Sequence, residues 1–155
     1  KEANTMSVKS QENNMRKLAD LLSRDLGYIW GERECGPNGD KKVFLNTGKT
    51  FLRALAKDLS LQEYKVSANP GGIAVCGECS LIGMWKNSGI YVMISQSCFR
   101  MESEVLFREV KHIKDYSGGC NCYLPRNALK MMSYYQVLDN LLLLRKEDAL
   151  YERAA

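Results

Sequence analysis

The chain has 155 residues, about the length of one domain, which is enough to bury a hydrophobic core without disulfides or metal. Its 45% hydrophobic and 26% charged residues are typical of a globular protein and exclude a disordered chain or a fibrous repeat. The net charge of +4 is compatible with nucleic acid or an acidic protein as partner but requires neither.

The N-terminal part of the chain predicts a tail and one helix. Residues 1–9 are polar and lack periodicity, so we expect a tail there, followed by a single domain over residues 10–155. From residue 10, apolar residues recur at helical spacing. Gly27 stands where a left-handed C-terminal cap would end this helix.

A loop, a short strand and a second helix are expected next. Glycines and an Asn-Gly pair within residues 31–40 favour a loop or hairpin, and residues 41–45 predict a short strand. The helix would begin at Asn46 or Thr47, whose side-chain oxygens can cap it, and end near residue 60.

The middle of the chain has the period-two alternation of strands. Strands are expected over residues 64–68, 73–85, 90–95 and 105–110, with turns or breaks between them. Over 90–95 the apolar and polar side chains alternate in the way that is typical of an antiparallel sheet with one buried face. We therefore expect an α+β fold in which an antiparallel sheet of about four strands is packed by two or three helices.

A long C-terminal helix is expected over residues 127–152. Its predicted core stripe consists of Leu129, Met132, Tyr135, Leu138 and Leu142. Further apolar residues, among them Met131, Tyr134 and Leu141, widen that stripe beyond what one sheet face would cover. Another helix of the same domain would cover the remainder in the simpler interpretation, and a homodimer or another protein would cover it in the alternative.

The single histidine, His112, limits the enzyme classes that this chain can support. Serine hydrolases, facial-triad iron enzymes and His-rich zinc enzymes all need imidazole, and no nucleophile is evident beside His112 in the sequence. We expect a protein that acts by binding rather than by catalysis.

Six cysteines are present, four of them in two close pairs. Cys76 and Cys79 form a C-x-x-C, and Cys120 and Cys122 form a C-x-C, which together offer enough thiolates for one tetrahedral zinc ion. In a regular strand Cys76 and Cys79 would point to opposite faces, so they could share an ion only if Gly77 allowed a tight turn. We expect free cysteines that pack as small apolar residues and no cofactor, with zinc binding or thiol redox chemistry as alternatives.

Two groups of basic residues are candidates for binding anions. Lys49 and Thr50 follow Thr47-Gly48 at the expected start of the second helix and resemble the end of a P-loop, although Val43 replaces its first glycine. Arg108, Lys111 and Lys114 lie close together in sequence, and Tyr91 is expected on a neighbouring strand.

Basic residues interleaved with aromatic residues can follow a nucleic-acid backbone and stack on its bases, and the simpler alternative is a solvated, protective strand edge. The leading hypothesis is a cytoplasmic domain that binds nucleic acid through Lys49, Thr50, Tyr91, Arg108, Lys111 and Lys114. The alternative is a protein interaction module or homo-oligomer that uses Met131, Tyr134 and Leu141. A membrane partner is not expected, because the longest aliphatic run, residues 141–144, is far shorter than the roughly 20 residues of a spanning helix.

Overall fold

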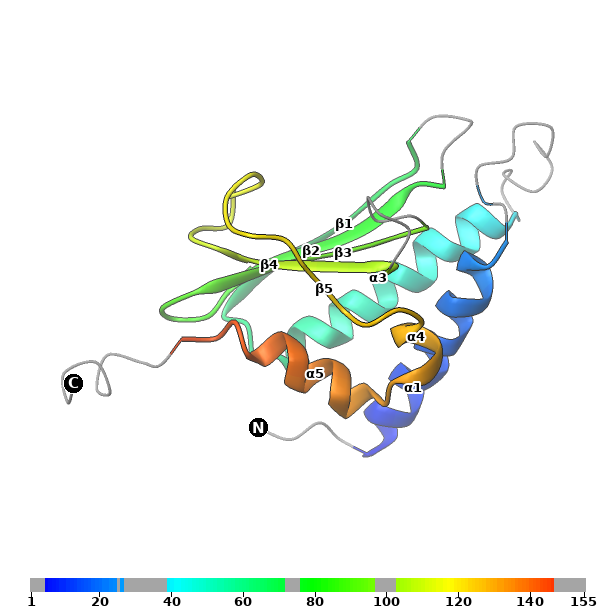
Figure 1. The fold of residues 1–155 in the computed structure, drawn as a ribbon, viewed down its shortest axis with the longest axis horizontal. Helices are drawn as coiled ribbons and strands as arrows, with labels where there is room; N and C mark the ends of the chain where they lie inside the picture. Colours follow the sequence, from blue (N-terminus) through cyan, green and yellow to red (C-terminus); the bar gives the residue numbers. More distant parts are fainter. Residues whose placement is uncertain (1–4, 25, 27–38, 72–75, 97–102, 147–155) are drawn as a thin grey trace.

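The architecture is one antiparallel sheet with helices on one of its faces (Figure 1). The computed structural model describes residues 5–24, 26, 39–71, 76–96 and 103–146. In chain order these residues form α1 (Thr5–Leu22), α3 (Asp40–Asp58), β1 (Glu63–Asn69), β2 (Glu78–Met84), β3 (Gly89–Ser95), β4 (Val105–Val110), β5 (Cys122–Tyr123), α4 (Ala128–Met131) and α5 (Tyr134–Leu142). The expected α+β class is confirmed.

The sheet is a meander in which each strand pairs with its neighbour in the chain. It has five strands in the described residues, one more than expected. The additional strand, β5, has two residues, which pair with Leu106 and Phe107 of β4. A strand of two residues is too short to show alternation, so the sequence pattern could not predict it.

Both N-terminal helices begin earlier than expected. Helix α1 begins at Thr5, within the segment predicted as a tail, and residues 1–4 lie outside the described part of the chain. Helix α3 begins at Asp40, so the predicted strand over 41–45 is wrong. The reason is helical spacing, because Phe44, Phe51 and Leu55 are all buried on the side of α3 that packs on the sheet.

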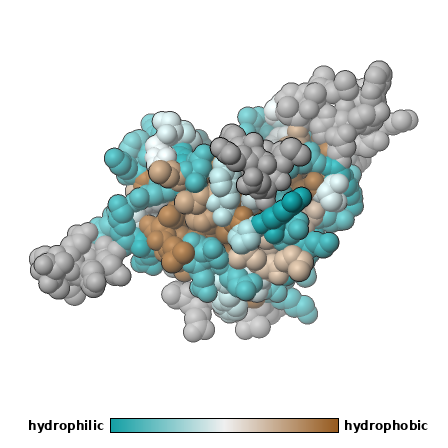
Figure 2. Space-filling model, viewed as in Figure 1, coloured by the Kyte–Doolittle hydropathy of each residue, from teal (hydrophilic) through white to brown (hydrophobic). Residues whose placement is uncertain are grey.

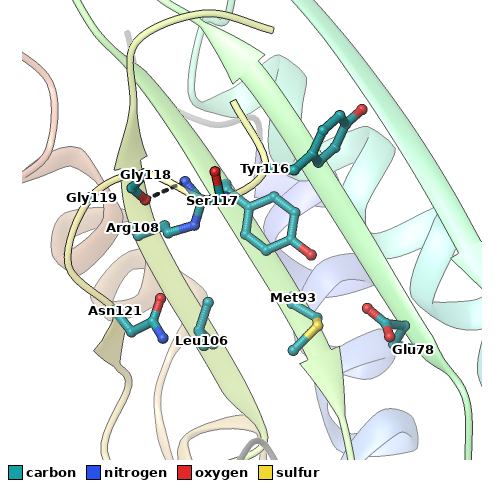
Figure 3. A pocket seen from close by; sticks show the side chains of 10 residues that line it. Glu78, Met93, Leu106, Arg108, Tyr116, Ser117, Gly118, Gly119 and Asn121 are labelled. Carbon is teal, nitrogen blue, oxygen red and sulfur yellow. Dashed lines mark hydrogen bonds between the residues drawn. The ribbon is translucent and has the colours of Figure 1, made fainter. Parts of the chain in front are cut away.

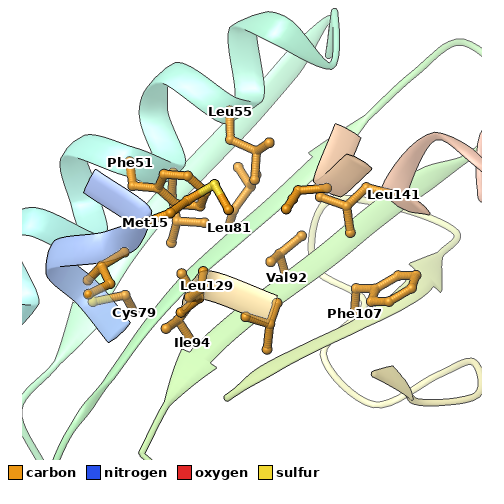
Figure 4. Packing of buried hydrophobic residues seen from close by; sticks show 14 of the residues in the cluster. Met15, Phe51, Leu55, Cys79, Leu81, Val92, Ile94, Phe107, Leu129 and Leu141 are labelled. Carbon is orange, nitrogen blue, oxygen red and sulfur yellow. The ribbon is translucent and has the colours of Figure 1, made fainter. Parts of the chain in front are cut away.

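The core lies between the helices and the sheet (Figure 4). Met15 of α1 and Phe51 of α3 pack above the β2 side chains, while Leu129 and Leu141 cover the part of the sheet formed by β3 and β4. Gly48 lets α3 approach β2 closely, since a Cβ atom at this position would lie 2.4 Å from the Sγ atom of Cys79.

The expected long C-terminal helix is not confirmed. Residue Met132 has an extended backbone that separates α4 from α5, and residues 147–155 lie outside the described part. Ser133 then starts α5 with a capping box, because its side chain accepts from the Gln136 amide while the Gln136 side chain accepts from the Ser133 amide. The break changes which residues face inward. Tyr134 and Leu141, predicted at an interface, are fully buried, whereas Met131 is exposed.

Hydrogen bonds of the Tyr134 side chain link α5 to α1 and α3. The Tyr134 hydroxyl donates to Asp58 at 2.6 Å and accepts from Gln11 of α1 at 3.3 Å. Burial raises the pKa of Tyr134, and its hydrogen bond to Asp58 adds to the shift, so the hydroxyl stays protonated and remains a donor. Among the described residues, none of the helices has the length and apolar composition needed to cross a membrane.

Candidate functional site

The sheet face opposite the helices, the open face, is the candidate site. The strand register brings its side chains into rows that run across the sheet. One row consists of Lys65, Ile82, Tyr91 and Arg108, and the next consists of Ser67, Ser80, Met93, Leu106 and Tyr123. Ile82, Met93 and Leu106 are buried, so the centre of this face is apolar and its margins carry polar and charged groups.

Arg108 holds the β4–β5 loop (residues 111–121) over the open face. Its guanidinium donates from Nη1 to the Gly118 carbonyl at 2.7 Å and from Nη2 to the Asp115 carbonyl at 2.9 Å. The same group lies over the ring of Tyr91, 4.8 Å from the ring centroid. Arg108 is only 4% exposed, so it is a buried anchor of the loop and not part of a solvated strand edge.

Hydrogen bonds within the β4–β5 loop fix its shape. The Asp115 carboxylate accepts from the amides of Lys111 at 3.0 Å and Gly118 at 2.8 Å. These amides hold the pKa of Asp115 below its ordinary value. Gly119 has φ of +78°, and a Cβ atom there would lie 2.6 Å from the Glu109 carbonyl oxygen, so only glycine fits this turn.

A cavity of about 430 Å³ lies between the open face and the loop (Figure 3). Met93, Leu106 and Tyr91 contribute from the strands, and Tyr116 contributes from the loop. The remaining lining comes from Glu78, Arg108, Ser117, Gly118, Gly119 and Asn121. The lining combines apolar and aromatic side chains with at least as many polar groups, and the volume falls within the range of about 300–1,000 Å³ that is usual for ligand pockets.

A second hollow, of about 530 Å³, lies at the end of the sheet where β4 passes into the loop. Lys86, Lys111 and His112 line it together with Glu63 and apolar residues. The Nδ1 atom of His112 accepts from the Lys114 amide at 3.3 Å, so a neutral ring carries its proton on Nε2 and can donate it outward. Lys86 and Lys111 therefore contribute basic groups to this second hollow.

The structure brings together four of the six residues predicted to bind an anion or nucleic acid. Tyr91 and Arg108 are cross-strand partners, and Lys111 and Lys114 lie exposed in the β4–β5 loop. Lys49 and Thr50 do not join them, because α3 packs on the other face of the sheet.

The resemblance of residues 47–50 to a P-loop is misleading. These residues lie within α3, where the backbone amides are already used by the helix, and not at its N-terminus. The hydroxyl of Thr50 donates to the Asn46 carbonyl at 3.1 Å within the same helix. The close approach of Gly48 to Cys79 explains the glycine in this segment.

The four cysteines of the C-x-x-C and C-x-C motifs are free and lie in different environments. Cys79 is fully buried against the carbonyl groups of Phe44 and Leu45, and burial raises its pKa to about 12, so it is a thiol at neutral pH. Cys120 is exposed, and Cys76 and Cys122 are partly buried. No cluster of three or more His, Cys, Asp or Glu side chains that could hold a metal ion occurs in the described ranges.

Sequence reasoning missed several residues that line the cavity, including Glu78, Met93, Leu106 and Asn121. The alternation over 90–95 does separate Tyr91 and Met93 from Ile90, Val92 and Ile94, and this was the available signal. The sequence pattern does not give the register between strands or the path of the loop back across the sheet, and both are needed to bring these residues together.

Comparison of the chain with models of known protein families, with curated proteins and with solved structures finds no match.

Proposed function

We propose that this domain binds single-stranded nucleic acid across the open face, with one base held in the cavity beneath the β4–β5 loop. The cavity carries the proposal, because it joins the aromatic rings of Tyr91 and Tyr116 to an apolar floor. Tyr116 is 57% exposed, so its ring is available to a base. Single-stranded nucleic acid is bound in this manner, with bases stacked on aromatic side chains and the backbone following basic groups.

The charges around the cavity support a polyanionic ligand. Lys111 and Lys114 are exposed in the loop, and Lys65 is exposed at the far end of the row that contains Tyr91. The net charge of +4 adds a weak attraction for polyanions in general. A duplex would fit this face less well than a single strand, because its bases are not free to enter a cavity.

The test is fluorescence anisotropy with labelled single-stranded RNA, single-stranded DNA and a duplex of the same sequence. We expect binding of the single strands that weakens steeply with salt, since bound lysines release counterions. Changing Lys111 and Lys114 to glutamine should reduce the slope of log K against log salt by about 1.4, at about 0.7 per phosphate contact on a single strand. No binding at low salt would overturn the proposal.

Two tyrosines provide a matched pair of variants. Tyr116→Ala removes an exposed ring at the cavity, and Tyr135→Ala removes one of similar exposure, 45%, on helix α5. Loss of one stacked base should weaken binding about 5- to 150-fold in Tyr116→Ala, while Tyr135→Ala should bind like the unchanged protein. Equal affinity of the two variants would show that the cavity is not the binding site.

Self-association is a second candidate function. Met131 and Leu143 are 71% and 82% exposed, and Tyr135 lies on the same side of α5 as Leu143. Figure 2 shows hydrophobic residues gathering around the C-terminal end of α5. Light scattering over a dilution series would test this, and a monomer at every concentration would exclude a homodimer. The predicted interface cannot include Tyr134 and Leu141, because both belong to the core.

A further inference from the structure

Glu78 is the feature of the cavity that stacking and phosphate binding leave unexplained. It is the one carboxylate among the described residues that line the cavity, and it lies at the beginning of β2. A negative charge beside a site for a polyanion weakens general attraction, so it needs a specific purpose. The backbone of Glu78 pairs with β1 and β3, but no hydrogen bond or ion pair links its side chain to another of the residues that the structure describes. Its oxygens are therefore available to accept from a ligand.

The arrangement of the cavity places polar groups at its two sides. Figure 3 shows Glu78 and Asn121 on opposite sides of Met93 and Leu106, which form the apolar floor between them. A flat ring lying on this floor would present its edge to the Glu78 carboxylate. Since an ionised carboxylate only accepts hydrogen bonds, it favours an edge that carries donors.

Bases differ at that edge. Cytosine carries an amino group that donates, whereas uracil has a carbonyl oxygen at the same position, which accepts. Two acceptors face to face repel each other, and the carboxylate also loses its contact with water. We infer that the cavity selects bases with an exocyclic amino group, and in particular cytosine over uracil, through Glu78. This inference rests on the proposed function and adds a specificity to it.

Oligocytidylate and oligouridylate of about eight nucleotides are suitable probes, because they have the same backbone and ring size, and lengths of about 4–16 nucleotides are typical of single-strand sites. At neutral pH we expect the unchanged protein to bind oligocytidylate about tenfold more tightly, which corresponds to about 1.4 kcal/mol. Glu78→Gln should bring the ratio close to one, since an amide can donate to uracil as well as accept from cytosine.

Glu63→Gln is the matched control. Glu63 lies on β1 outside the cavity, is exposed, and loses the same single charge in the variant. It should keep the preference for cytosine, and thermal unfolding should show that both variants are folded. Equal binding of the two oligomers by the unchanged protein, or an unchanged ratio in Glu78→Gln, would overturn the inference and leave the proposed function standing. Failure to bind either oligomer would overturn both.

Discussion

Replacing Arg108 by methionine tests whether this side chain anchors the β4–β5 loop. The variant removes hydrogen bonds to the carbonyl groups of Gly118 and Asp115, at 2.7 and 2.9 Å, and the contact with the ring of Tyr91. Hydrogen bonds that involve a charged group contribute about 1.5–3 kcal/mol each, and a cation–π contact contributes about 0.5–2 kcal/mol. Methionine retains part of the apolar packing, and the freed carbonyl groups can bind water. We therefore expect the free energy of unfolding to fall by about 2–4 kcal/mol.

Urea unfolding measures this loss, and amide hydrogen exchange locates it. The Lys111 and Gly118 amides donate to Asp115, so their protection should fall in Arg108→Met. Arg53→Met, on the exposed side of α3, is the control and should change stability by less than about 0.5 kcal/mol. If Arg108→Met behaved like Arg53→Met, with unchanged exchange in the loop, the anchoring role would be refuted.

Two further predictions concern the helix–sheet contact and the acid stability of the loop. In Gly48→Ala the free energy of unfolding, measured in urea, should fall by about 1–2 kcal/mol, because overpacking against Cys79 outweighs the gain of about 1 kcal/mol in helix propensity. A gain in stability would contradict the close approach of α3 to β2. In a Cys79→Ala background the glycine substitution should have a smaller effect. The pKa of Asp115 is lowered in the folded state, so its carboxylate stabilises the fold. This stabilisation is fully present above the ordinary carboxyl pKa of about 3.9 and is lost as the pH falls through the lower pKa of the folded state. Asp115→Asn should therefore show a flatter dependence of unfolding free energy on pH than the unchanged protein between about pH 7 and about pH 3, and parallel curves would argue against this.

The sequence predicts the strands better than the ends of the helices. The strands expected over 90–95 and 105–110 agree with β3 and β4. The alternation over 90–95 identifies Ile90, Val92 and Ile94 as the residues that pack on the helices. The strand predicted over residues 41–45 is wrong because the consecutive apolar side chains of this segment fit a short strand as well as the first turns of a helix. The helical spacing of Phe44 with Phe51 and Leu55, all buried on one side of α3, distinguishes the two.

The C-terminal region shows why Tyr134 and Leu141 were wrongly predicted to lie at an interface. A continuous helix would place Leu129 and Tyr134 on different sides, but the extended backbone at Met132 lets both face the core. The Ser133-x-x-Gln136 pattern was present in the sequence as a sign of a new helix start.

The candidate site was only partly visible in the sequence. The proximity of Arg108 to Lys111 and Lys114 is local, and its pairing with Tyr91 follows from adjacent strands. The cavity depends on the path of the loop back across the sheet. Hydrogen bonds from the Arg108 side chain to backbone carbonyl groups of the loop hold it there. No spacing rule predicts such contacts, so Glu78 and Asn121 could not be assigned to one site.

The side chains of β2, β3 and β4 alternate between the helices and the cavity. Val92 and its neighbours on one side of β3 pack against the helices, whereas Tyr91 and Met93 on the other side line the cavity. The two sets belong to separate clusters of buried residues, so a substitution that changes the lining of the cavity leaves the side chains that contact the helices in place. The sheet therefore separates the residues that shape the cavity from the residues that hold the helices.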